Sequence, residues 1–196
     1  MSREFAIADT CFLIDWARYR RRDLLFSLFR TVFVPESVLR EVKSGETIAW
    51  IASSLARGSL SLYVEAGDEV EEARRLVEEA RVLGHLPSVD YPEAFCLVVG
   101  RRRGYVVLTE NRGALIAADL LPAYRGVAVW RSFEVLWELV QRGLLPRDCG
   151  NPLAPLLEYQ VDTKHVFPQK DLKAFEAKIR RECGEVDRGR ERGQRD

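Results

Sequence analysis

Residues 104–109 read GYVVLT, a continuous apolar run that predicts a strand buried inside a parallel sheet. Similar strands are expected at residues 4–9, EFAIAD, and at residues 31–34, TVFV. Two shorter ones are expected at residues 59–64 and 127–130, and stretches with helical spacing separate all of them. Strands that alternate with helices predict an α/β fold, here a three-layer sandwich with a mainly parallel central sheet.

The 196 residues are enough for one compact domain with an appendage. The alternation of strands and helices stops near residue 146, so residues 1–146 are expected to form the main domain. Residues 147–196 differ in composition and are expected to form a C-terminal extension that is helical around residues 169–181. The charged end, residues 185–196, is expected to be disordered.

The charged residues balance, since 30 Lys and Arg side chains face 30 Asp and Glu side chains. This excludes nucleic-acid binding through bulk charge and requires any basic footprint to be local. One local run, residues 101–103, is expected to complement the C-terminus of a helix. No apolar run approaches the roughly 20 residues of a membrane span, and the first residues lack the pattern of a signal peptide. A cytoplasmic protein outside the membrane is expected.

The cysteines are scattered along the chain and form no CxxC pair, so a zinc site is not expected. All four are instead expected to be buried free thiols: Cys11, Cys96, Cys149 and Cys183. The chain holds a single Met, and its depletion in thermolabile residues hints at a thermophilic source. In such a source an intracellular bridge between Cys149 and Cys183 is the alternative.

Acidic side chains fall where the strands end. Asp9 terminates the first strand, and Glu110 and Asn111 follow the strand at residues 104–109. The carboxyl ends of parallel strands share one edge of a sheet, which is the edge where ligands bind. Two further acids lie on helices next to this edge: Glu41 after the second strand, and Glu93 at the start of the helix before residue 104.

Acids that converge at one edge require a counter-charge. Two carboxylates about 5 Å apart repel by about 3 kcal/mol at an effective dielectric constant of 20. A divalent cation removes this repulsion, and oxygen ligands without neighbouring His or Cys favour Mg²⁺ or Mn²⁺. Such a centre suits the hydrolysis of phosphodiesters, because the metal orients a water, lowers its pKa and neutralises charge that develops on the phosphate.

Four stretches, in order along the chain, resemble the motifs of PIN domains. Residues 7–14, IADTCFLI, resemble the first motif, whose aspartate ends a strand, and residues 34–42, VPESVLREV, are similar to the second, a proline-started helix that carries an acid. Residues 93–97, EAFCL, resemble the third motif. Residues 107–112, VLTENR, resemble the fourth, in which a threonine is followed two residues later by an aspartate.

The resemblance spans residues 4–145 and implies a PIN-like, metal-dependent endoribonuclease. Such proteins are commonly VapC-like toxins of a toxin–antitoxin pair, dimeric and neutralised by a small antitoxin protein. The motif positions imply these catalytic residues: Asp9, Glu41, Glu93 and Asn111. Three of them are implied as ligands of Mg²⁺ or Mn²⁺, with a neighbouring acid as a fourth: Asp9, Glu93, Asn111 and Glu110.

One position departs from the family pattern, because Asn111 stands where the fourth motif has an aspartate. An amide oxygen can bind a metal or orient water but contributes no charge, and Glu110 is a candidate substitute. An active nuclease and a weakened PIN module, which binds RNA or a protein partner without cleavage, both remain open. A small-molecule-binding α/β domain is a third hypothesis, but residues 9–12, DTCF, lack the glycine-rich phosphate loop that it requires.

Several site residues also have an ordinary structural interpretation. Asp9 fits a helix N-cap, and Asp90 with Glu93 fits a capping box, a role that does not exclude metal binding. Thr10 and Thr109 can either fill the strand edge or hydrogen-bond to the site and its substrate. Glu41 also fits an ordinary exposed helix acid, although its place in the second motif favours a role in the site.

Two basic features are candidates for contact with RNA phosphates. Residues 18–22 hold four arginines, among them Arg18 and Arg20, and form either a solvated helix end or a phosphate contact with Tyr19 as a stacking face. Arg112, beside Asn111, is a better candidate than the arginines of residues 101–103.

Overall fold

The computed structural model describes residues 4–82 and 87–193. The chain divides into two units, Met1–Ser132 and Phe133–Asp196, and each is described by itself. None of the helices within the described residues has an apolar stretch of the length that a bilayer crossing requires.

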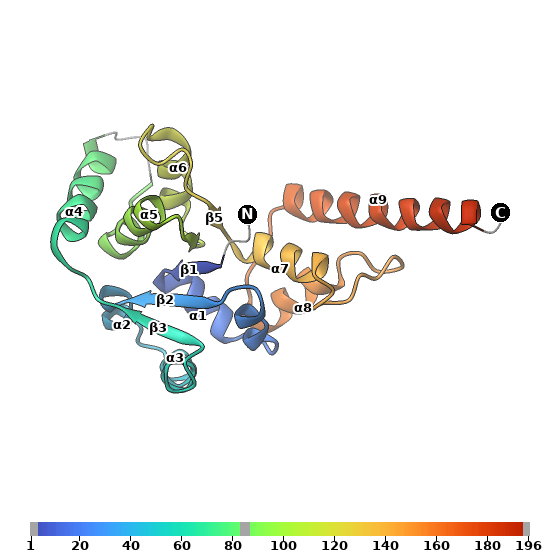
Figure 1. Ribbon diagram of the computed structural model, residues 1–196, viewed down its shortest axis with the longest axis horizontal. Helices are drawn as coiled ribbons and strands as arrows, with labels where there is room; N and C mark the ends of the chain where they lie inside the picture. Colours follow the sequence, from blue (N-terminus) through green and yellow to red (C-terminus); the bar gives the residue numbers. More distant parts are fainter. Residues whose placement is uncertain (1–3, 83–86, 194–196) are drawn as a thin grey trace. The chain divides into compact units, whose positions relative to one another are not determined.

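The first unit is built on a sheet of five strands, all parallel, in the order β3-β2-β1-β4-β5 (Figure 1). The strands are β1 (Phe5–Ala8), β2 (Thr31–Pro35), β3 (Leu60–Tyr63), β4 (Val106–Leu108) and β5 (Val129–Trp130). Ala6 of β1 pairs with Val32 on one side and with Val106 on the other. The prediction of an α/β fold with a parallel central sheet is confirmed.

Helices cover both faces of this sheet and complete the predicted three layers (Figure 1). One layer holds α1 (Thr10–Ala17), the short 3₁₀ helix η1 (Arg22–Ser27), α2 (Glu36–Glu41) and α3 (Gly45–Ala56). The other holds α4 (Gly67–Val82), α5 (Tyr91–Arg103) and α6 (Arg112–Leu120). Ile7 and Val107 belong to the apolar core beneath α5, together with Phe95 and Val99 of that helix.

The strand order reverses beside β1. The chain goes from β1 outward to β2 and β3, then returns to place β4 on the other side of β1. In open parallel sheets, the crevice outside the carboxyl ends of the strands at such a reversal is where ligands bind. The edge of the sheet at β1 and β4 is therefore the place to look for a site.

The arginine run of residues 101–103 forms the last turn of α5, where its charge complements the helix C-terminus as predicted. Each arginine also pairs with an acid of α4. Arg102 reaches Glu72 at 2.7 Å, Arg103 reaches Glu69 at 2.9 Å, and Arg101 contacts Glu72 as well. Both glutamates are buried, so this network joins α4 to α5 and serves the fold rather than a nucleic acid.

The second unit consists of α7 (Ser132–Gln141), α8 (Ala154–Thr163) and α9 (Gln169–Gly193). Its core is aromatic: Phe133 lies edge-on to Phe167 and Phe175, and Trp137 lies edge-on to Phe175. Because these contacts join α7 to α9, the boundary between the units falls before α7, whereas the sequence placed it after residue 146. The last helix continues past residue 181 to Gly193, where the sequence predicted disorder; Glu and Arg are good helix formers and support it. Residues 194–196 lie outside the described residues.

Two of the four cysteines form a disulfide, Cys149–Cys183, which ties the segment before α8 to α9. The prediction that all four cysteines are free thiols is therefore wrong for this pair. The alternative, a bridge between Cys149 and Cys183, is confirmed. Cys96 is a fully buried thiol, as expected, and Cys11 is a partly exposed one. Spacing along the sequence cannot show that the two cysteines meet, because the packing of α7 on α9 decides it.

Reduction of this disulfide is expected to lower the free energy of unfolding of the second unit by about 3–4 kcal/mol, since the bridge closes a separation of 34 residues. Urea unfolding with and without dithiothreitol measures the change. A variant with Cys149→Ser and Cys183→Ser is the control and should not respond to the reductant. Equal stability of the reduced and oxidised wild type would contradict the prediction.

Candidate metal centre

One polar residue follows each of the two strands at the reversal point, Asp9 after β1 and Thr109 after β4. Both are fully buried. The backbone N–H of Asp9 donates to the carbonyl oxygen of Leu108 at 3.0 Å, and the Thr109 hydroxyl donates to Asp9 Oδ2. The sheet thus brings two side chains that are 100 positions apart into direct contact.

Asp9 is also the N-cap of α1, which confirms the capping interpretation. The backbone N–H of Phe12 donates to Oδ1 at 2.9 Å, and Cys11 Sγ lies 3.1 Å from each carboxylate oxygen. The same carboxylate therefore starts a helix and faces the end of the neighbouring strand. Its orientation is held by groups from two different elements.

Burial raises the pKa of Asp9 from 3.8 to about 7. Hydrogen bonds from Thr109, Phe12 and Cys11 act in the opposite direction, and the nearby Glu93 raises the pKa further. At neutral pH the protonated and ionised forms of Asp9 are therefore about equally populated, and a positive charge beside the carboxylate would favour the ionised form.

Glu93 lies in the first turn of α5 with 8% of its surface exposed. Its Oε1 accepts a long hydrogen bond of 3.3 Å from the amide nitrogen of Asn111, while Oε2 is buried and has no hydrogen-bond partner among the described residues. Burial also raises the pKa of Glu93, and the charges of Asp90 and Glu41 add to this effect. The predicted capping box is wrong, because Asp90 is the N-cap residue but its side chain makes no capping hydrogen bond.

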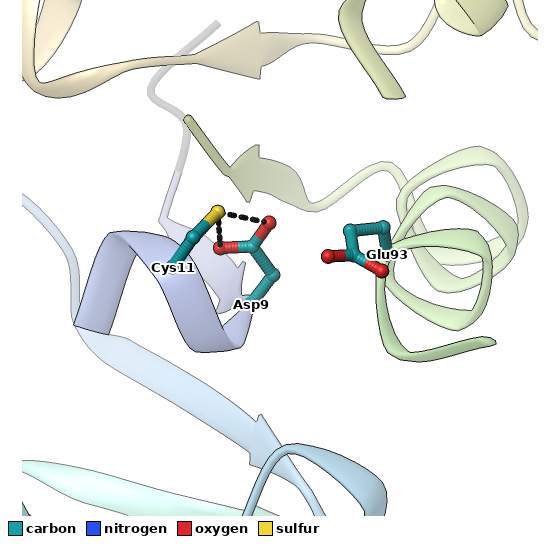
Figure 2. Close-up of side chains that lie close together, drawn as sticks. All are labelled: Asp9, Cys11 and Glu93. Atoms are coloured by element: carbon teal, nitrogen blue, oxygen red, sulfur yellow. Dashed lines mark hydrogen bonds between the residues drawn. The ribbon is translucent and has the colours of Figure 1, made fainter. Parts of the chain in front are cut away.

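Three side chains form the cluster that we call the Asp9–Cys11–Glu93 centre. One ligand atom from each lies within 4.8 Å of the other two. Figure 2 shows the carboxylate of Asp9 between Cys11 on its own helix and Glu93 on α5. Sequence reasoning missed Cys11, although its position two residues after Asp9, in the first turn of the same helix, was the available signal.

The residues present fit a divalent cation. Carboxylate oxygens are the ligands that Mg²⁺ and Mn²⁺ prefer, and here two carboxylates face each other in a buried place. A buried carboxylate oxygen without a partner, as in Glu93, costs free energy unless a donor or a cation satisfies it.

Glu41 lies at the rim of the centre. It ends α2, is exposed, and accepts a hydrogen bond of 2.8 Å from the Thr10 hydroxyl on Oε2. It is outside the group within 4.8 Å, yet close enough for its charge to raise the pKa of Glu93. Both predicted threonines therefore hydrogen-bond to acids: Thr10 to Glu41 and Thr109 to Asp9.

Asn111 and Glu110 both hydrogen-bond to backbone groups. Asn111 caps α6 through Oδ1, which accepts from the N–H of Ala114 at 3.0 Å, so its nitrogen faces Glu93. Glu110 accepts a hydrogen bond of 2.6 Å from the backbone N–H of Ser132. Glu110 is not part of the Asp9–Cys11–Glu93 centre, whereas Asn111 contacts the centre through its hydrogen bond to Glu93.

The arginine candidates differ in position. Arg18 is the C-cap of α1, whose eight residues rise about 12 Å, so Arg18 and Arg20 follow the end of the helix remote from Asp9. Tyr19 is fully buried against Trp16, and the prediction that it offers a stacking face is wrong. Arg112 is exposed at the first position of α6.

A hollow of about 350 Å³ is lined by residues of α2, α4 and α5, and sequence reasoning missed it too. Its lining includes Arg40, the neighbour of Glu41 on α2, and Tyr91, two residues before Glu93 on α5. Arg74 of α4 lies on another side, and both guanidinium groups are largely exposed. Two acids, Glu36 and Glu65, also line the hollow, so they balance the charge of its two arginines.

The geometry defines an α/β protein with a buried acidic centre at the ligand-binding edge of a parallel sheet. Neither a protein-family model nor a curated protein sequence matches this chain.

Proposed function

We propose that the chain is an endoribonuclease that hydrolyses RNA phosphodiester bonds with the help of Mg²⁺ or Mn²⁺. The observation that carries the proposal is the buried pair of Asp9 and Glu93 at the reversal point of the sheet, with one glutamate oxygen lacking any partner among the described residues.

The roles of the side chains follow from their contacts. Asp9 and Glu93 bind the cation, while the Thr109 hydroxyl and the Phe12 N–H keep Asp9 in its orientation. When bound, the cation lowers the pKa of a water and neutralises charge on the phosphate. Glu41, exposed at the rim and held by Thr10, accepts the proton of the attacking water as that water's oxygen bonds to phosphorus. The bond from phosphorus to the leaving ribose oxygen breaks in the same step, and that oxygen takes a proton from solvent.

Further parts of the proposal rest on the resemblance to PIN domains. They are the choice of RNA as substrate, a role as the toxin of a toxin–antitoxin pair, a small antitoxin protein as partner, a homodimeric state and a cytoplasmic location. Arg18, Arg20 and Arg112 are proposed to contact RNA farther from the cleaved bond.

The second candidate function is a PIN module that binds RNA or a protein partner without cleavage. Asn111 favours it, because its amide adds no negative charge to the centre and its oxygen already accepts a hydrogen bond from Ala114. Incubation of labelled RNA with the protein and Mn²⁺, with and without EDTA, separates the two functions. Cleavage that EDTA stops supports the nuclease, whereas binding without cleavage supports the module.

Asn111→Asp is expected to preserve or raise cleavage and to increase cation affinity by roughly tenfold or more. An aspartate can still cap α6, but it replaces the hydrogen bond to Glu93 with a repulsion of about 3 kcal/mol at 5 Å. The variant should therefore melt at a lower temperature than wild type in EDTA and regain stability with Mn²⁺. If only the variant cleaves RNA, the active-nuclease function is wrong for the natural chain.

A further inference from the structure

Cys11 is an unusual neighbour for a centre of this kind. Its Sγ lies 3.1 Å from both oxygens of Asp9 and belongs to the group whose ligand atoms lie within 4.8 Å of one another. Figure 2 shows the thiol directed at the Asp9 carboxylate. A hard cation such as Mg²⁺ gains little from a sulfur atom, but Zn²⁺ binds thiolate and carboxylate ligands together.

The distances between the three ligand atoms suit a small ion once the side chains move slightly closer together. Oxygen and sulfur ligands of a tetrahedral Zn²⁺ lie about 3.3–3.8 Å from one another, so a pair of ligand atoms as far apart as 4.8 Å must approach by about 1.0–1.5 Å. Glu93 can supply this movement, because its Oε2 has no hydrogen-bond partner among the described residues and its side chain has several rotatable bonds. The same buried oxygen is an observation, independent of the cysteine, that points to a missing ligand.

We propose that Cys11 is a direct metal ligand in the Asp9–Cys11–Glu93 centre and gives it a preference for Zn²⁺ over Mg²⁺. The inference rests on the proposed function to the extent that both concern the same cation site. Three protein ligands leave one position of a tetrahedral ion open, which is the pattern of catalytic rather than structural zinc sites.

Binding through sulfur requires the loss of a proton. Without a cation the thiol donates to the carboxylate of Asp9 and therefore carries a proton. When Zn²⁺ binds, the S–H bond breaks, the sulfur electron pair bonds to the ion, and the proton passes to the buffer. Mg²⁺ leaves the thiol protonated, so Zn²⁺ binding should release about one more proton than Mg²⁺ binding.

Affinity for Zn²⁺ alone does not test this proposal, because Zn²⁺ binds most oxygen sites more tightly than Mg²⁺ does. The informative quantity is the ratio of the Zn²⁺ and Mg²⁺ affinities, compared between wild type and Cys11→Ser. Serine retains a hydroxyl that can donate to Asp9 and removes only the sulfur. The ratio is expected to fall roughly tenfold or more, with the Mg²⁺ affinity itself changing less than about threefold.

Cobalt(II) gives a readout that does not depend on activity. The full chain, loaded with Co²⁺ without reductant so that Cys149 and Cys183 stay bonded, should show a near-ultraviolet sulfur-to-cobalt charge-transfer band. Cys11→Ser should lose the band. The matched control is Cys96→Ala, which removes the other free thiol of the chain and should retain the band.

The outcomes separate this inference from the proposed function. Co²⁺ that binds without the band, or equal proton release with Zn²⁺ and Mg²⁺, overturns the role of Cys11, even if RNA cleavage with Mn²⁺ persists. Absence of any cation binding overturns both proposals. Should Cys11→Ser fail to fold, the wild-type band and the proton release still decide, with Cys96→Ala excluding the second thiol.

Discussion

Asp9→Asn is expected to abolish cation binding and to lower RNA cleavage at least about 100-fold. Loss of a residue that merely supports a metal ligand costs roughly 10- to 100-fold, and a direct ligand should cost more. The substitution keeps the shape of the side chain and an oxygen that can accept from Phe12, so α1 retains its cap. It removes the one fully buried negative charge of the centre.

The comparison requires a control that removes a carboxylate from the same helix. Asp15→Asn is suitable, because Asp15 lies on α1 and pairs with Arg18 at 3.8 Å, outside the Asp9–Cys11–Glu93 centre. Isothermal titration with Mn²⁺ and cleavage of labelled RNA should leave Asp15→Asn close to wild type. Cleavage by Asp9→Asn at the wild-type rate would mean that the activity has another source.

The second large effect is a pH dependence of stability in the metal-free protein. Asp9 has a pKa of about 7 when folded and an ordinary value of 3.8, so the folded state binds more protons between these values. The contribution of Asp9 to the free energy of unfolding should therefore be greatest below pH 4, fall as the pH rises, and level off above pH 7. A shift of about three pH units corresponds to a loss of up to about 4 kcal/mol. The raised pKa of Glu93 acts in the same direction.

Urea unfolding in EDTA at a series of pH values measures this decline. Asp9→Asn should flatten most of it and be more stable than wild type at pH 8, while Asp15→Asn should follow wild type. Saturating Mn²⁺ should restore more stability at pH 8 than at pH 5, because the cation binds the ionised carboxylates. Identical pH profiles of wild type and Asp9→Asn would contradict the raised pKa of Asp9.

Much of the local structure could be predicted because it depends on neighbours in the chain. Residues 104–109 contain β4, residues 4–9 contain β1, and Asp9 stands at the strand end and caps the next helix, as its residue type favours. Predictions about individual side chains were less successful. Tyr19 is buried, Asp90 makes no side-chain cap, and Glu110 binds the backbone of Ser132.

The cysteines show the same limit of sequence reasoning. Their spacing predicts neither the Cys149–Cys183 bridge nor the approach of Cys11 to the Asp9 carboxylate. A disulfide depends on which helices pack together, and the environment of a thiol depends on which charged groups face it. Both are decided by contacts between distant segments.

The amino-acid sequence by itself determined the succession of strands and helices and the placing of an acid after the first strand, because hydrophobic periodicity and capping act over a few residues. Only the tertiary structure decided that β4 lies beside β1, that Thr109 bonds to Asp9, and that Glu93 keeps a buried oxygen without a partner among the described residues. The order of strands in a sheet results from the packing of whole helices on its two faces, and no local pattern encodes that packing.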